Sequence, residues 1–387
     1  MKTIRRDDFC PGMYVYKFGK GTFDDPDVFI DEPIMSVVEF NDLVPPYVDE
    51  LIIDPDKYQP LDGVIVEPPD EKILSASTPF AEEFANMDEL YNEALFQMKE
   101  LFTGIRKGRG FDYQTPNEIA LDMVDSVFRN EHAAVAATKT RRFDDYLLTH
   151  SLNVSILSVV LGKYIGLSVD QLCSLAMAGL FHDIGKCRIP MAILNKPGKL
   201  TDDEFRTIKR HPFESYAMLR RQKNIPEEVL KGVLHHHERY DGSGYPYGLL
   251  EDELSIFAGV LGIVDVYDAM TSKKGYGTTM APAAALRKMF GSMTNSFPVE
   301  QVEELIGCIG VYPAGSMVRM VDGRYGVVTG RGKASSIKPI VKIILGMDFT
   351  PIASEEIDLS KSTDKGLGLH SFVDPNRYGI DIALFLK

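Results

Sequence analysis

The spacing of apolar and polar residues changes twice along this chain of 387 residues. Residues 1–75 contain short β-prone runs separated by Pro and Asp, which is typical of strands joined by turns. From residue 79 to about residue 310 the apolar positions recur at helical spacing, and beyond GVYPAGS (310–316) the β-prone runs return. The pattern predicts a mainly α protein, with a small N-terminal α+β or β-rich domain and a small C-terminal β subdomain.

Individual elements can be assigned within this pattern. The expected N-terminal strands are GMYVYKF, ELIID and GVIVEPP, and the expected C-terminal strands are SMVRMV, GRYGVVTG, IVKIIL and YGIDIALFL. Helix starts are expected where Ser or Thr precedes Glu or Gln by three residues, at Thr115 (with Pro116 and Glu118), at Ser168 (with Gln171) and at Thr201 (with Glu204).

Composition and charge narrow the class of protein. The net charge is −14, and residues 1–80 hold 17 Asp/Glu against 7 Lys/Arg. Such a chain repels a phosphate backbone, so we expect neither DNA nor RNA as a partner. The apolar stretch 154–167 is interrupted by Lys163 and predicts a buried helix, not a membrane span. Four scattered cysteines without CxxC spacing, and an N-terminus without a signal-like apolar segment, lead us to expect reduced thiols in a cytoplasmic protein.

Histidines are concentrated in the helical region. Six of the eight lie between residues 150 and 237, and HHHERYDGSGYP (235–246) holds three of them before a turn-forming sequence. Imidazoles and carboxylates in apolar helices are costly to bury unless they are paired or bound to metal. Because the candidates lie too far apart for one helix, we expect several helices to bring them together around divalent metal. They are His150, His182, Asp183, His211, His236, His237 and Asp265.

These ligands are numerous enough for two ions. Imidazole and carboxylate without cysteine suit iron, manganese, nickel or zinc better than magnesium or calcium. A shared carboxylate would hold two ions about 3.5–4 Å apart around a bridging hydroxide, which suits attack on phosphorus. Lys186, one helical turn after His182, is expected to contact the same phosphate. The pattern therefore predicts metal-dependent hydrolysis of a phosphate ester.

The same residues resemble the HD-GYP phosphodiesterases, a branch of the HD hydrolase superfamily. The matching motifs are HSLNV (150–154), HDIGK (182–186), IPMAILNKPGKLTDDEF (189–205), HP (211–212), HHERYDGSGYP (236–246) and DVYDAMTS (265–272). The segments CPGMYVYKF and ELIID are similar to an accessory domain that often precedes such modules. The resemblance implies an HD-type helical bundle, so we expect an accessory domain at 1–78, a helical linker at 79–140, the HD-GYP catalytic domain at 141–310 and the β subdomain at 311–387.

The resemblance also implies an activity and a role for each residue. The reaction is hydrolysis of cyclic di-GMP to the linear pGpG, and onward to GMP, at two divalent ions, with Fe or Mn expected and Ni or Zn as alternatives. A first metal would be bound by His150, His182, Asp183 and Asp265, and a second by the bridging Asp183 with His211, His236 and His237. Asp183 and Lys186 would be the catalytic residues, and Lys186, Tyr245 and Lys274 would bind substrate.

Three positions depart from the family pattern. Tyr146 stands where members with a third metal carry Glu, so we expect two metals. Ser215 replaces a usual glycine, which predicts a small change in packing. Lys274 begins Lys-Gly-Tyr where the family prefers Arg-Pro-Tyr, so the positive charge remains but the bidentate guanidinium is lost. No ligand is missing, and we expect an active enzyme.

Other residues have structural interpretations. His132 and His370 are expected to be ordinary hydrogen-bonded residues, and His235 lies outside the motif. Tyr245 equally suits packing of its own loop. The spacing of Asp265 and Asp268 is common in helix-surface pairs, and RKGRG (106–110) is typical of a solvated turn.

Two other functions stay open from the sequence. The same chemistry on 3′,3′-cyclic GMP-AMP is one, because pocket shape rather than metal ligands selects the base. A catalytically weak receptor for a cyclic dinucleotide is the other, and the intact ligand set disfavours it. A homodimer or a signalling-protein partner is compatible with the chain. The sequence does not favour any one role for the N-terminal domain.

Overall fold

The structure of the chain is a computed structural model. It describes residues 2–5, 13–18, 29–34, 50–53, 78–109, 114–140, 146–196, 198–222, 225–272, 280–332, 335–362 and 367–387. The chain divides into two compact units, Met1–Ser75 with Gly166–Ser168, and Ala76–Ile165 with Val169–Lys387. The domain boundaries expected from the sequence stay predictions.

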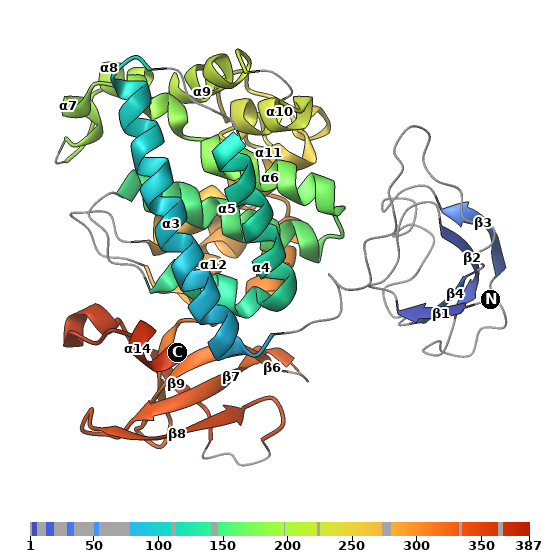
Figure 1. The fold of residues 1–387 in the computed structure, drawn as a ribbon, viewed down its shortest axis with the longest axis vertical. Coiled ribbons are helices and arrows are strands. Elements are labelled where there is room, and N and C mark those ends of the chain that lie inside the picture. The colour runs from blue at the N-terminus through green and yellow to red at the C-terminus, as the bar shows by residue number, and fades with distance from the viewer. Residues whose placement is uncertain are drawn as a thin grey trace. The chain divides into compact units, whose positions relative to one another are not determined.

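The first unit contains an antiparallel sheet of four described strands in the order β1-β4-β2-β3 (Figure 1). The strands are β1 (Lys2–Arg5), β2 (Met13–Phe18), β3 (Phe29–Ile34) and β4 (Glu50–Ile53). Strands β2 and β4 confirm two of the predicted runs, whereas GVIVEPP lies outside the described residues. Strands β1 and β3 were not predicted.

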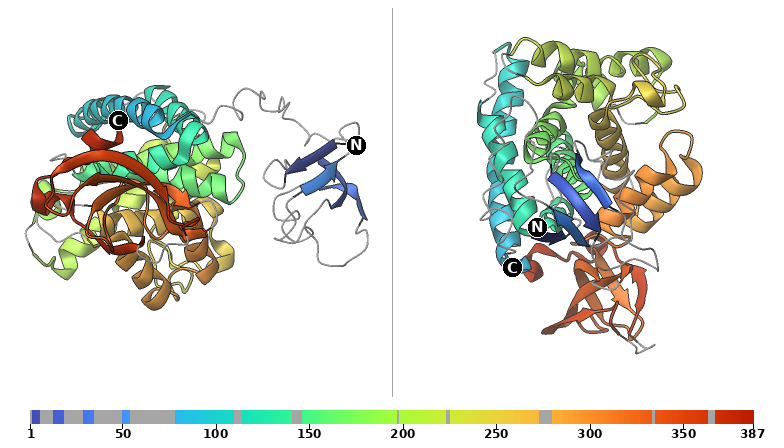
Figure 2. Two further views of the ribbon diagram at one scale, coloured as in Figure 1. Left: turned by 90° about the horizontal axis from the view of Figure 1, so that it is seen from below. Right: turned by 90° about the vertical axis from the view of Figure 1, so that its right-hand side faces the viewer.

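The second unit is a helical bundle followed by a sheet, which confirms the mainly α fold class (Figure 2). Its helices are α3 (Phe80–Arg106), α4 (Gln114–Lys139), α5 (Tyr146–Tyr164), α6 (Val169–Phe181), η3 (Ile184–Arg188), α7 (Met191–Leu194), α8 (Asp202–Ile208), α9 (His211–Leu219), α10 (Glu227–His235), η4 (Glu251–Glu253), α11 (Ile256–Thr271), α12 (Pro282–Ser292) and α13 (Val299–Ile309).

Helix α5 forms the centre of this bundle. It packs against α3, α4, α6, α11 and α13, and its residues are buried almost all round. This confirms the buried helix expected from 154–167, and Lys163 at its end is paired with Glu131 at 3.1 Å. Among the described residues, no helix combines the length and apolar character that a membrane crossing requires.

Two of the three predicted helix starts are confirmed. Thr201 caps α8 in the expected capping box with Glu204, and α6 begins directly after Ser168. Helix α4 begins at Gln114, so the predicted start at Thr115 was wrong by one residue. Its axis is interrupted at Asn130, where the side-chain oxygen accepts from the backbone N–H groups of His132 and Ala133 and starts a second helical segment.

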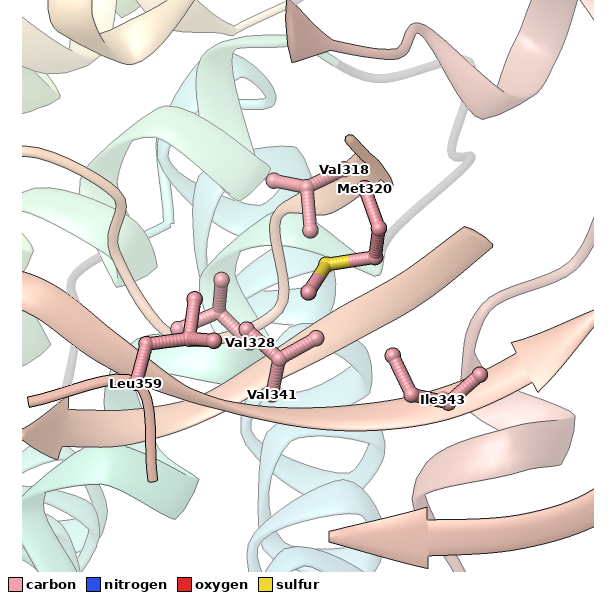
Figure 3. Packing of buried hydrophobic residues seen from close by; sticks show 6 residues of the cluster. All are labelled: Val318, Met320, Val328, Val341, Ile343 and Leu359. Carbon is pink, nitrogen blue, oxygen red and sulfur yellow. The ribbon is translucent and has the colours of Figure 1, made fainter. Parts of the chain in front are cut away.

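The C-terminal sheet is antiparallel, in the order β8-β7-β6-β5-β9. Its strands are β5 (Met317–Met320), β6 (Tyr325–Gly332), β7 (Ser335–Leu345), β8 (Pro351–Asp358) and β9 (Leu369–Phe372). Its concave side buries an apolar cluster (Figure 3) consisting of Val318, Met320, Val328, Val341, Ile343 and Leu359. The first three predicted C-terminal strands are thereby confirmed.

The fourth predicted strand, YGIDIALFL, was wrong. This segment contains the end of η5 (Pro375–Tyr378) and the short helix α14 (Ala383–Leu386). The side chain of Asp374 accepts from the N–H of Asn376, and Asp381 accepts from the N–H of Ala383. These aspartates start helical turns, so local capping overrides the alternating apolar pattern.

Candidate metal centre

The seven predicted ligands lie together in the middle of the bundle. Five helical elements supply them: α5 carries His150, the α6–η3 junction carries His182 and Asp183, α9 begins with His211, α10 ends before His236 and His237, and α11 carries Asp265. All are buried except His237, whose side chain is 16% exposed and therefore marks the open side.

Their ligand atoms form two adjacent groups. His150, His182 and Asp183 form one, and His211, His236 and His237 form the other, each with ligand atoms within 4.8 Å of one another. Asp183 joins them, because one of its oxygens lies 3.1 Å from Nε2 of His211 and the other 3.4 Å from Nε2 of His182.

The carboxylate of Asp265 also spans both groups. One oxygen lies 2.9 Å from Nε2 of His150, and the other lies 3.7 Å from Nδ1 of His237. Carboxylates that lie between the two groups suit a pair of neighbouring cations.

Three imidazoles are held by backbone carbonyl groups. In each, Nδ1 donates to the carbonyl three residues earlier: His182 to Gly179 at 2.7 Å, His211 to Ile208 at 2.8 Å, and His236 to Val233 at 2.7 Å. These carbonyls lie at helix ends, where they have no helical partner. A neutral ring that donates from Nδ1 presents a lone pair at Nε2, so all three rings present acceptors to the centre.

Several of these acceptor atoms face one another, and no hydrogen lies between them to form a hydrogen bond. Nε2 of His211 and Nε2 of His236 are 3.3 Å apart, and both rings already donate from Nδ1. Nε2 of His182 and one oxygen of Asp183 are buried with no hydrogen-bond partner among the described residues. Buried acceptors of this kind are costly unless a cation lies between them. The donor set of nitrogen and oxygen therefore fits divalent metal ions.

Burial sets the protonation of the imidazoles. It lowers the pKa of His236 and His237 well below the ordinary value, and it lowers the pKa of His211 although Asp183 opposes this. For His150 burial also lowers the pKa, but the hydrogen bonds that its ring donates to Asp265 and Asp268 outweigh it and raise the pKa to about 9. Three neutral rings are thus available as ligands.

The bridging carboxylate is held in its charged form. Burial alone would raise the pKa of Asp183, but the charges of Lys186 and His182 outweigh it and lower the pKa well below the ordinary value. Lys186 forms an ion pair with Asp183, three residues earlier, and its side chain is 21% exposed. The α-helical turn expected between His182 and Lys186 was wrong, because these residues enter the 3₁₀ helix η3.

Close packing of η3 against α9 brings the two groups together. A side chain at Gly185 would meet the carbonyl oxygen of His211 at 2.1 Å, so only glycine fits there. Ser215 secures this contact, since its hydroxyl donates to the carbonyl of His182 and accepts from the N–H of Gly185, both at 2.8 Å. The sequence predicted only a small change in packing at Ser215, and these two hydrogen bonds were not predicted.

The loop after His237 is ordered by Glu238, which the sequence did not single out. Its buried carboxylate accepts from the N–H groups of Tyr247, Gly248 and Leu249. A side chain at Gly244 would lie 2.4 Å from the backbone of Glu238, so glycine is required where the loop crosses it. An acid directly after two candidate ligands was the available signal.

Tyr245 lies at the open side of the centre. Its ring stacks on His237 with centroids 4.7 Å apart, and the ammonium of Lys209 lies 5.0 Å from its centroid. Lys209 is a further cation that the sequence interpretation missed, two residues before His211. The third expected substrate-binding residue, Lys274, lies outside the described residues.

The spacing of Asp265 and Asp268 is common in helix-surface pairs, but both side chains are buried, 7% and 0% exposed, as the apolar run around Asp265 indicated. Tyr146 stands where family members with a third metal carry Glu, and its ring stacks on His150 with centroids 5.4 Å apart. His132 packs near Gly330 of β6, away from the centre, and residues 106–109 form the expected exposed turn.

The chain is similar to known proteins in sequence. A family model described as "HD domain" matches residues 128–296. Cyclic di-GMP phosphodiesterase PA4108 of Pseudomonas aeruginosa is 33% identical over 76% of this chain and 71% of its own length. The cyclic di-GMP phosphodiesterase response regulator RpfG of Xanthomonas campestris is 37% identical over 38% of this chain and 39% of its own. The 3′3′-cGAMP-specific phosphodiesterase 1 of Vibrio cholerae is 38% identical over 35% of this chain and 31% of its own.

The extent of the match to PA4108 and the HD-domain match define the class. The chain belongs to the HD-GYP family of HD-domain phosphodiesterases, as the resemblance implied. Membership of this family implies divalent-metal binding, and the described residues supply two groups of ligands for it.

Proposed function

We propose that this protein hydrolyses cyclic di-GMP to pGpG, and onward to GMP, at a centre of two divalent ions. The observation that carries the proposal is the pair of buried ligand groups joined by Asp183. The names of PA4108 and RpfG support cyclic di-GMP as the substrate.

The ligands divide between two positions in this proposal. The first ion is held by His150, His182, Asp183 and Asp265, and the second by Asp183, His211, His236 and His237. When bound, such ions polarise the phosphoryl oxygen and lower the pKa of water. Fe or Mn is proposed, with Ni or Zn as alternatives, because the donor set is imidazole and carboxylate without thiolate.

Residues at the open side orient the substrate. Lys186 places its ammonium beside Asp183 and is partly exposed, so a phosphate that reaches the centre meets this charge. Tyr245 presents an aromatic ring next to His237, which suits stacking against a base. Lys274 is proposed to bind phosphate or guanine from its sequence position alone.

A second substrate is favoured by one observation, the 38% identity to a 3′3′-cGAMP-specific phosphodiesterase. The metal ligands treat both nucleotides alike, since both contain the same phosphodiester. A cytoplasmic location, and a homodimer or a signalling-protein partner, are proposed from the sequence only.

The test offers both nucleotides to the protein purified anaerobically with Fe(II) or Mn(II). We expect linear products, with cyclic di-GMP cleaved faster than cyclic GMP-AMP. The matched variants are Asp183→Asn, expected to be inactive, and Asp203→Asn, an exposed acid on α8 that is expected to retain full activity. Binding of either nucleotide without any product would contradict the proposal and favour a receptor.

A further inference from the structure

His150 differs from the other candidate ligands in the group that holds its ring. His182, His211 and His236 donate to carbonyls at helix ends. His150 lies in the second turn of α5, where the preceding carbonyls accept the bonds of the helix itself. Its Nδ1 donates instead to a carboxylate oxygen of Asp268, at 2.8 Å.

Asp268 is fully buried and is itself held in place by other donors. Its second oxygen accepts from Nδ2 of Asn153 at 3.0 Å and from the hydroxyl of Ser272 at 2.6 Å. The side-chain oxygen of Asn153 accepts in turn from the hydroxyl of Tyr91 at 2.9 Å. The Tyr91 hydroxyl also lies 3.2 Å from the carbonyl of Thr149. The donors of Asn153, Ser272 and His150 converge on Asp268 and hold its carboxylate as an acceptor.

The hydrogen-bond network begins at Tyr91, on a helix outside the HD-domain match. Tyr91 is fully buried on α3, and the match covers only residues 128–296. Helix α3 packs on α4, α5 and η3, so it lies against the elements that carry His150 and Asp183. The hydrogen bonds run from α3 through α5 to α11, and back to a ligand on α5.

We propose that Tyr91, Asn153 and Asp268 are positioning residues that hold the His150 ring with Nδ1 on Asp268 and Nε2 toward the metal position, and that α3 is therefore part of the metal centre. The inference rests on the proposed function. A carboxylate that accepts from Nδ1 fixes the orientation of the ring. It also makes Nε2 a stronger electron-pair donor to a metal ion than a backbone carbonyl at Nδ1 does. The position built around His150 thus depends on Asp268, whereas His211 and His236 are held by backbone and do not.

The test measures metal binding by the full chain, apart from activity. Metal-depleted protein is titrated with Mn(II), and bound ions per chain are counted after equilibrium dialysis. Wild type is expected to bind two ions. Asp268→Asn is expected to weaken one position about 10–100-fold and leave the other unchanged. Tyr91→Phe removes only the distant hydroxyl and is expected to weaken the same position about 2–10-fold.

The control is Tyr267→Phe, which changes a fully buried tyrosine beside Asp268 whose hydroxyl is not in the chain of bonds. It is expected to bind like wild type. Unchanged binding in Asp268→Asn and Tyr91→Phe overturns the inference, and so does equal weakening of both positions, which indicates general damage. If Asp268→Asn does not fold, Tyr91→Phe decides alone. Wild type that binds no ion overturns the proposed function instead.

Discussion

The candidate metal centre of the helical bundle and the core of the C-terminal sheet bury opposite kinds of side chain. The sheet buries Val318, Val341, Ile343 and their neighbours, an apolar cluster that stabilises the fold by leaving water. The centre of the bundle buries imidazoles and carboxylates, with acceptors facing one another. Burial of apolar side chains stabilises the fold and needs no further explanation. Burial of hydrogen-bond acceptors that face one another indicates a bound cation. Variants in the two regions should therefore separate function from stability.

The largest effect is expected from Asp183→Ala. It removes the carboxylate that joins the two ligand groups, so hydrolysis should fall about 1000-fold or more. Added Mn(II) should raise the melting temperature of wild type but not of the variant, because binding to the folded state is what stabilises it. Steady-state kinetics and thermal unfolding with and without metal measure both. Retained turnover would remove Asp183 from the mechanism.

The complementary variant is Ile343→Ala in the sheet. The side chain is fully buried in the apolar cluster, so the free energy of unfolding should fall by about 2–5 kcal/mol. Activity per folded molecule should equal that of wild type. Denaturant unfolding and kinetics at a temperature where both proteins are folded check this. A large loss of kcat with unchanged stability would show that the two regions are not separable.

A smaller effect is expected from Glu238→Gln. The carboxylate holds three consecutive backbone N–H groups of the loop that carries Tyr245, and the amide is a weaker acceptor. We expect kcat/KM to fall about 10-fold, or about 1.4 kcal/mol, with little change in melting temperature. Glu253→Gln is the control, since that exposed side chain accepts from one N–H, of Leu250. Equal losses in both variants would contradict a specific role for Glu238.

The smallest effect concerns the link between bundle and sheet. Glu131 on α4 pairs with Arg331 on β6 and with Lys163 on α5. Glu131→Gln should cost about 1 kcal/mol of unfolding free energy at pH 7. Burial raises the pKa of Glu131, but Lys163, His132 and Arg331 outweigh it and lower the pKa.

The pH dependence of that link follows from the lowered pKa. A depressed carboxyl pKa stabilises the fold above the unfolded value of about 4.3, and the gain is lost as the pH falls through the folded pKa. The difference between wild type and Glu131→Gln should therefore shrink below about pH 4. Urea unfolding at several pH values measures it, and a difference that grows in acid would contradict the assignment.

The sequence predicted the ligands better than their supports. His150, His182 and Asp265 stand out because polar residues in apolar helices leave a visible signal, and the structure brings them together. Asp268 and Glu238 give no such signal, since an acid near other acids, or in a loop, is usually solvated. Their roles depend on which backbone or ring packs against them, and that is fixed only by the fold.

The sheet shows the same limit from the other side. Strands β5 to β7 carry apolar runs and were predicted, whereas β8 is mostly exposed and its polar sequence has no strand pattern. YGIDIALFL has the alternation of a strand, but Asp374 starts a helical turn just before it and Asp381 starts another within it. Pattern predicts elements where burial dominates, and fails where capping or exposure decides.

The central claim is that two cations lie between the two ligand groups. Crystals grown anaerobically with Mn(II) or Fe(II) allow anomalous scattering to be recorded at the absorption edge of each metal. The account predicts two peaks, one beside His150 and His182 and one beside His211, His236 and His237, with Asp183 contacting both. A map with no peak among these side chains, or a single ion that Asp183 does not contact, would contradict it.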